Sequence, residues 1–120
     1  MTDVEDIRLL LNKSIEQLYI ELGQQLLSPE YRAFPFPKER YMQRAREWLL
    51  ENRERLRQII CDHDRVKSFM NSSRLEERVL LISAIVDLIS SMCSGISPVT
   101  VAVLLVKEGL NSLCVNEDKV

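Results

Sequence analysis

Apolar residues recur every three or four positions along most of this chain, and this period constrains the fold more than any other feature. In the first segment the series is Val4, Ile7, Leu11, Ile15, Leu18, Leu22 and Leu26. Such spacing lines one face of an α-helix, whereas a half-buried strand would alternate at every second residue. Ser28-Pro29 restarts the chain, so the pattern predicts one long helix that ends near Leu27.

The middle of the chain predicts a second long helix and a short third one. Residues 33–37 contain two prolines and are predicted to form a non-helical connecting segment. We expect the rings of Phe34 and Phe36 to pack against the helices and hold this segment in place. From about 37 to 61, one face carries apolar side chains: Tyr41, Ala45, Trp48, Leu49, Leu56, Ile59 and Ile60. A brief apolar set then predicts a helix over about 64–70.

Two further segments are apolar almost all round. Residues 74–92 leave only a narrow polar stripe, and they begin after Ser73 with the spacing of a capping box. The segment after Ser97-Pro98 is rich in valine, which on its own would suit a buried strand. We expect a helix there, because a serine followed by proline starts helices and Gly109 suits a left-handed end.

These segments predict an all-α protein, a helical bundle of four main helices with one or two short ones. A length of 120 residues fits one domain. We expect that domain to cover residues 1–114 and a flexible tail to cover 115–120, where the sequence turns polar.

The two apolar helices also predict self-association. A small bundle encloses one helix that is apolar all round, but two exceed what the amphipathic helices can cover. We therefore expect a homodimer with a two-fold contact through the last two helices. The candidate interface residues are Leu81, Ile85, Leu88, Val103, Leu104 and Val106.

Location is indicated by the cysteines and the apolar runs. Cys61, Cys93 and Cys114 are odd in number and widely spaced, which fits neither a disulfide framework nor a zinc motif. The acidic start of the chain does not resemble a signal peptide, and no apolar run reaches the ~18 residues that a membrane span needs. We expect a cytoplasmic protein with reduced thiols and no membrane contact.

The chain offers little for catalysis. His63 is its one histidine, and Cys61 lies two positions away, on the opposite side of a continuing helix. The three glycines are scattered and form no phosphate-binding loop, and no ligand set for a metal has helical spacing. We expect no enzymatic activity, no metal and no cofactor.

Charge suggests one surface for a partner. Arg46, Arg53 and Arg57 follow one another at steps of seven and four on one flank of the second helix, with no acid expected between them. Such a stripe suits a charged partner. It is thin for a nucleic-acid interface in a chain with a net charge of −2.

Three polar residues are predicted inside the fold or at its boundary. Asn52 falls at the centre of the apolar face of the second helix, and His63 continues that face. Asp87 lies midway along the most apolar helix, where a solvent stripe with Ser83 and Ser90 is favoured over a buried ion pair with an arginine.

Together these features predict a non-catalytic helical module for protein–protein interaction, of an adaptor or regulatory kind. It would self-associate through its apolar C-terminal helices and bind another protein through the arginine stripe. The alternatives are a regulatory protein that contacts nucleic acid through the stripe, and a binder of apolar small ligands with a cavity between the last two helices.

Overall fold

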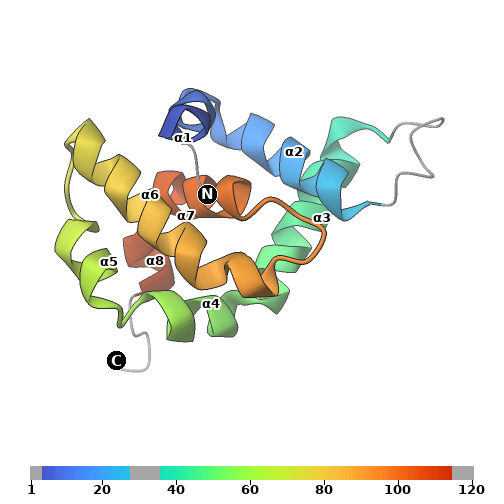
Figure 1. The fold of residues 1–120 in the computed structure, drawn as a ribbon. Helices are drawn as coiled ribbons and strands as arrows, with labels where there is room; N and C mark the ends of the chain where they lie inside the picture. Colours follow the sequence, from blue (N-terminus) through green and yellow to red (C-terminus); the bar gives the residue numbers. More distant parts are fainter. Residues whose placement is uncertain (1–3, 28–35, 115–120) are drawn as a thin grey trace.

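The computed structural model describes residues 4–27 and 36–114, and over these ranges every regular element is helical. Figure 1 shows the helices gathered around α7 (Pro98–Glu108), which contacts α1, α2, α6 and α8. The all-α prediction is confirmed. The expected tail at 115–120 and the ring of Phe34 lie outside the described residues, whereas the ring of Phe36 packs edge-on against Tyr41, with centroids 5.9 Å apart.

The first predicted helix is in fact two helices, α1 (Val4–Leu11) and α2 (Ile15–Leu26). Ser14 begins α2 with a complete capping box, since its Oγ accepts from the Gln17 amide and the Gln17 side chain accepts from the Ser14 amide. Lys107 of α7 donates to the carbonyl oxygens of Leu11 and Lys13 at 2.7 and 2.6 Å. The ammonium group thus satisfies carbonyls that the break leaves without helical partners.

The second predicted helix is also divided, into α3 (Lys38–Glu51) and α4 (Arg53–Ile60). The break falls at Asn52, whose φ and ψ of −106° and 7° are not helical. Its side-chain amide donates to the carbonyl of Trp48 at 2.9 Å. Asparagine competes in this way for the hydrogen bonds of the helix backbone, so it bends the chain where the apolar period continues.

Three of the remaining helices, α5 to α7, begin and end close to their predicted positions, whereas the short helix α8 was not predicted. The remaining elements are α5 (Asp64–Phe69), α6 (Leu75–Ile89) with a single 3-10 turn η2 (Ser90–Met92), α7, and the short α8 (Leu110–Cys114). Ser97 caps α7 by accepting from the amide of Thr100, and Pro98 occupies its first turn. Gly109 ends α7 with a φ of 105°, a conformation that side chains disfavour. The valine-rich segment is therefore a helix, as predicted.

The core is built around α7, whose residues 100–106 are all buried. The helices α1 and α2 cover it on one side and α6 and α8 on others, while α3 packs on α2 and α4 on α6 (Figure 1). Each of the two long predicted helices is divided in two, and the halves pack as separate helices: α1 and α2 contact α7, while α3 packs on α2 and α4 on α6. The described residues thereby bury most of the apolar side chains of both α6 and α7 within one chain. The sequence suggested that the amphipathic helices were too few to cover both.

Candidate functional site

The residues predicted to form a dimer interface lie inside the single chain. Leu81, Ile85, Val103, Leu104 and Val106 are buried in the core, and Leu88 is half-buried. A contact between two copies through these side chains would require α6 and α7 to separate. The excess of apolar surface that predicted the homodimer is thus accounted for within one molecule.

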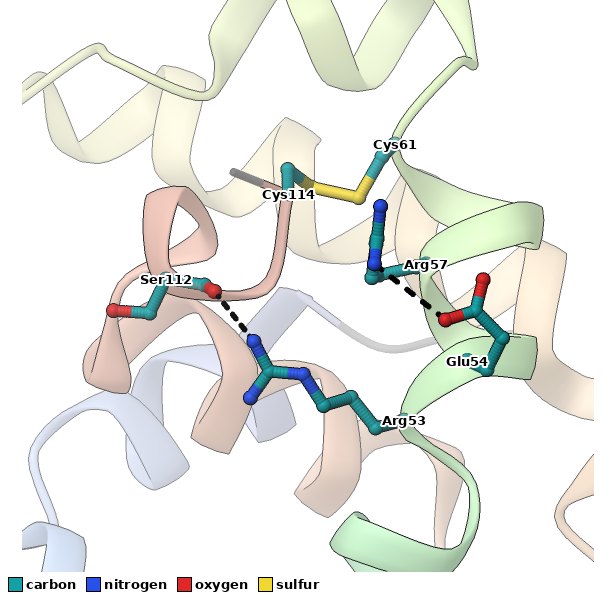
Figure 2. The surroundings of a disulfide bond; sticks show 6 residues. All are labelled: Arg53, Glu54, Arg57, Cys61, Ser112 and Cys114. Atoms are coloured by element: carbon teal, nitrogen blue, oxygen red, sulfur yellow. Dashed lines mark hydrogen bonds and ion pairs between the residues drawn. A yellow bond between two sulfur atoms is a disulfide. The ribbon is translucent and has the colours of Figure 1, made fainter. Parts of the chain in front are cut away.

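The prediction that the three arginines form an unpaired stripe is wrong, while their role in binding a partner stays a prediction. Arg57 lies 3.5 Å from the carboxylate of Glu54, one turn earlier in α4. Arg53 donates to the main-chain oxygen of Ser112 in α8 at 3.1 Å (Figure 2). The bend at Asn52 also changes the helix direction between Arg46 and Arg53. The three arginines therefore do not lie in one unpaired row along a single straight helix.

Arg46 and Arg53 nevertheless meet at one hollow of the surface. A groove of about 310 Å³ runs between the α3–α4 bend and the end of α7 with α8. Five leucines line it: Leu49, Leu50, Leu56, Leu105 and Leu113. Tyr19, Arg46, Arg53, Glu108 and Ser112 supply its polar parts. We call this feature the leucine groove.

Leu50 is the most exposed large apolar side chain in the described part of the chain, with 71% of its surface accessible. It lies four residues after Arg46 and three before Arg53, so its position on the arginine flank was readable in the sequence. The sequence prediction missed it because Leu50 lies off the apolar face that packs on the core. A single exposed leucine is common on protein surfaces, so what distinguishes Leu50 is that it borders a groove lined by four other leucines.

A polar network at the other side of the leucine groove holds Arg46. Tyr19 of α2 donates its hydroxyl hydrogen bond to Glu108 at the end of α7, over 2.5 Å. The guanidinium of Arg46 lies 5.1 Å from the centroid of the Tyr19 ring, a cation–π contact. Burial, and then the hydrogen bond and the charge of Glu108, raise the pKa of Tyr19 above its usual range, although Arg46 lowers it. The hydroxyl therefore stays protonated and the network keeps its donor.

The three predicted polar residues have local roles. Half-buried Asn52 donates to the carbonyl of Trp48 in the preceding helix, α3. Half-buried His63 begins α5, where its Nδ1 accepts from the amide of Arg65, 3.3 Å away. Asp87 is exposed, so the solvent stripe is correct and its place among buried polar residues is wrong. Every buried side-chain nitrogen or oxygen in the described ranges has a hydrogen-bond partner.

The expectation of three reduced thiols is wrong. Cys61 after α4 and Cys114 at the end of α8 form a disulfide (Figure 2), while Cys93 is a buried free thiol. The pair is 53 residues apart in sequence, and only the packing of α8 on α4 brings the two together. A second hollow, of about 260 Å³, lies beside the disulfide and includes Arg57.

A third hollow, of about 320 Å³, lies near the place where the sequence predicted a cavity for an apolar ligand, between the last two long helices. It opens where α6 and α7 meet the loop at 70–73, and it includes Arg78, Leu81 and Val106. Most of its exposed lining is polar, so it differs from the enclosed apolar cavity that such a ligand would need.

Neither a membrane-spanning helix nor a metal-binding cluster lies in residues 4–27 and 36–114. No helix there is both long and apolar enough to cross a lipid bilayer. No cluster of three or more histidine, cysteine, aspartate or glutamate side chains is placed to hold a metal in the same ranges. Comparison with protein-family models, with curated proteins and with solved structures finds no match to this chain.

Proposed function

We propose that this protein is a non-catalytic interaction module and that the leucine groove is its binding surface. The partner is an amphipathic protein segment with apolar side chains on one face and acidic residues beside them. The observation that carries the proposal is the exposed Leu50, which stands between two arginines at the edge of a groove lined by leucines.

The composition of the leucine groove supports this partner. Protein interfaces draw most of their binding energy from a few residues, among which tyrosine and arginine are enriched, and Tyr19, Arg46 and Arg53 line this groove. The groove has two arginines and one glutamate, and that glutamate already accepts from Tyr19. The formal charge of +1 and the exposed Arg46 favour acidic over basic segments. A helix laid in the groove would contact it through residues one turn apart.

The proposal takes a single chain as the binding unit. The apolar residues that would join two copies through α6 and α7 are used to hold those helices together. Self-association is therefore not needed to cover the core, and the leucine groove is complete within one copy.

A designed peptide tests the proposal. The probe is a fluorescent helical peptide with leucines at one-turn intervals and glutamates flanking them, and a second peptide carries lysines in place of the glutamates. We expect the acidic peptide to bind at least ~10-fold more tightly by fluorescence anisotropy, a difference of about 1.4 kcal/mol. Arg46→Glu is expected to reverse this preference, because it inverts the charge at the groove edge.

Two matched variants separate the leucine groove from general surface effects. Leu50→Asp is expected to weaken the acidic peptide at least ~10-fold, because it places a charge where an apolar contact forms. Leu9→Asp changes an equally apolar side chain on α1, 63% exposed and away from the groove, and should change the affinity less than ~2-fold. Equal effects of the two variants, or no binding of the acidic peptide, would contradict the proposal.

A further inference from the structure

We infer that Cys61 and Cys114 form a reversible thiol–disulfide exchange site for a dithiol reductant, and that its oxidation state decides whether α8 stays in place as a wall of the leucine groove. The first part stands without the proposed function. The effect on partner binding rests on that function.

The disulfide is open to attack from solvent. Both cysteines are half-buried, and both border the surface hollow of about 260 Å³ together with Glu54, Arg57, Gln58 and Asp62. An attacking thiolate must reach one sulfur, and a surface hollow at the bond permits that approach. Cys93 lies in the core instead, where burial raises the pKa of its thiol and keeps it unreactive.

A cationic side chain lies beside the bond. The guanidinium of Arg57 borders the same hollow as the two sulfurs, and Figure 2 shows it projecting from α4 toward them. A nearby positive charge stabilises a thiolate over a thiol. Glu54 pairs with Arg57, and Asp62 borders the same hollow, so the positive charge beside the disulfide is offset by two carboxylates.

The disulfide is one of a small number of contacts that hold α8 in place. This helix has five residues, too few to persist as an isolated helix, and Gly109 separates it from α7. Its other attachments are the buried side chains of Leu110 and Leu113, the hydrogen bond from Arg53 to Ser112, and a long contact of 3.4 Å between Asn111 and Asn71. The cross-link is the one covalent tie between this segment and α4.

The same short helix supplies one wall of the leucine groove. Leu113 and Ser112 line the groove, and Gly109 lines it at the start of the segment. Opening the cross-link at Cys114 therefore loosens the wall opposite Leu50 and Arg53. Oxidation fastens the same wall to the helix that bears Arg53.

The exchange balances with a dithiol as co-substrate. One thiolate of the reductant attacks a sulfur of the protein disulfide, so that a mixed disulfide forms and the other cysteine leaves as thiolate. The second thiol of the reductant then displaces the remaining cysteine. Two electrons and two protons pass to the protein, which gains two thiols, and the reductant becomes a disulfide.

The experiment uses the full chain in buffers of reduced and oxidised dithiothreitol. Thiols are trapped with an alkylating reagent and counted by mass, and amide hydrogen exchange is measured on the same samples. We expect a single two-electron transition that modifies Cys61 and Cys114 together and spares Cys93. Reduction should speed exchange in residues 110–114 at least ~10-fold while residues 101–106 change less than ~2-fold.

Variants separate the cross-link from the reductant. Cys114→Ser should show fast exchange in residues 110–113 without any reductant, and Cys93→Ser should keep the transition of the parent chain. The exchange site is refuted if Cys61 and Cys114 remain thiols in the oxidising buffer or resist reduction while the chain stays folded. The role of α8 is refuted if reduction leaves its amide exchange unchanged.

Affinity for the acidic probe peptide is a separate measurement. We expect the reduced chain and Cys114→Ser to bind it at least ~5-fold more weakly than the oxidised chain. A peptide that binds neither form refutes the proposed function and the regulation, while the thiol and exchange data still decide the redox site. Equal affinity for both forms refutes the regulation alone.

Discussion

Replacing Leu104 with alanine is expected to lower the free energy of unfolding by about 2–5 kcal/mol. Leu104 has no exposed surface and lies in the middle of α7, the helix that four others contact. Truncation removes buried apolar surface and leaves a cavity, because packed helices relax only partly around a missing side chain. Chemical denaturation followed by circular dichroism measures the loss.

Two controls are needed to interpret the loss of stability in Leu104→Ala: the same truncation at an exposed leucine, and the dependence of the denaturation midpoint on protein concentration. Leu80→Ala removes the same atoms from a side chain that is 44% exposed on α6, so it should cost less than about 1 kcal/mol. If the folded chain is a monomer, the denaturation midpoint of the variant does not depend on protein concentration. A midpoint that rises with concentration would show instead that the folded chain is an oligomer that dissociates on unfolding.

The second large effect is expected at Gly23, where α2 crosses α3. A methyl group built there would lie 2.0 Å from the main-chain oxygen of Tyr41, far inside the ~3.5 Å at which such atoms pack. Gly23→Ala must therefore push the two helices apart. We expect it to lower the free energy of unfolding by about 3 kcal/mol, at the upper end of what overpacking costs.

Whether Gly23→Ala lowers or raises the free energy of unfolding tests the close approach of the two helices. In an unobstructed helix alanine is more favourable than glycine by about 1 kcal/mol, so the variant would then be more stable. Gln24→Ala is the control, since the neighbouring side chain is exposed on the same helix and its loss should change stability by no more than about 0.5 kcal/mol. A Gly23→Ala variant more stable than the parent chain would mean that the helices do not approach closely at this position.

Several features of the fold were predictable because they depend on residues within one turn of each other. Ser97, Pro98 and Gly109 mark the two ends of α7 in the sequence, and they occupy the cap, the first turn and the left-handed end in the structure. Periodicity likewise identified the helical character of the other long segments. The local signals outweighed the strand preference of the valines.

The breaks in the long helices were harder to predict. Ser14 and Gln17 carried a capping signal, but the apolar period runs through it without a change, since α1 and α2 both turn their apolar faces to α7. The other group that stabilises this break is Lys107, 94 residues beyond Lys13. At Asn52 the same residue that interrupts the apolar face ends one helix and begins the next.

The candidate site was predictable only in part. The sequence pointed to Arg46 and Arg53, and Leu50 lies on the same flank, but the groove between them needs a second wall from α7 and α8. That wall is held by a disulfide between cysteines 53 residues apart, whose spacing gave no sign of pairing. The pairing of Arg57 with Glu54 was a local contact that the sequence could have indicated.

By itself, the sequence determined that this chain is helical, which residues end its best-capped helix, and how much of each helix must avoid water. Periodicity measures the width of an apolar face, but it does not say which neighbour covers that face. Only the tertiary structure decided that α6 and α7 are covered within one chain, that Asp87 faces solvent, and that Cys61 meets Cys114. These outcomes depend on contacts between residues far apart in the sequence, and such contacts form only when the helices pack.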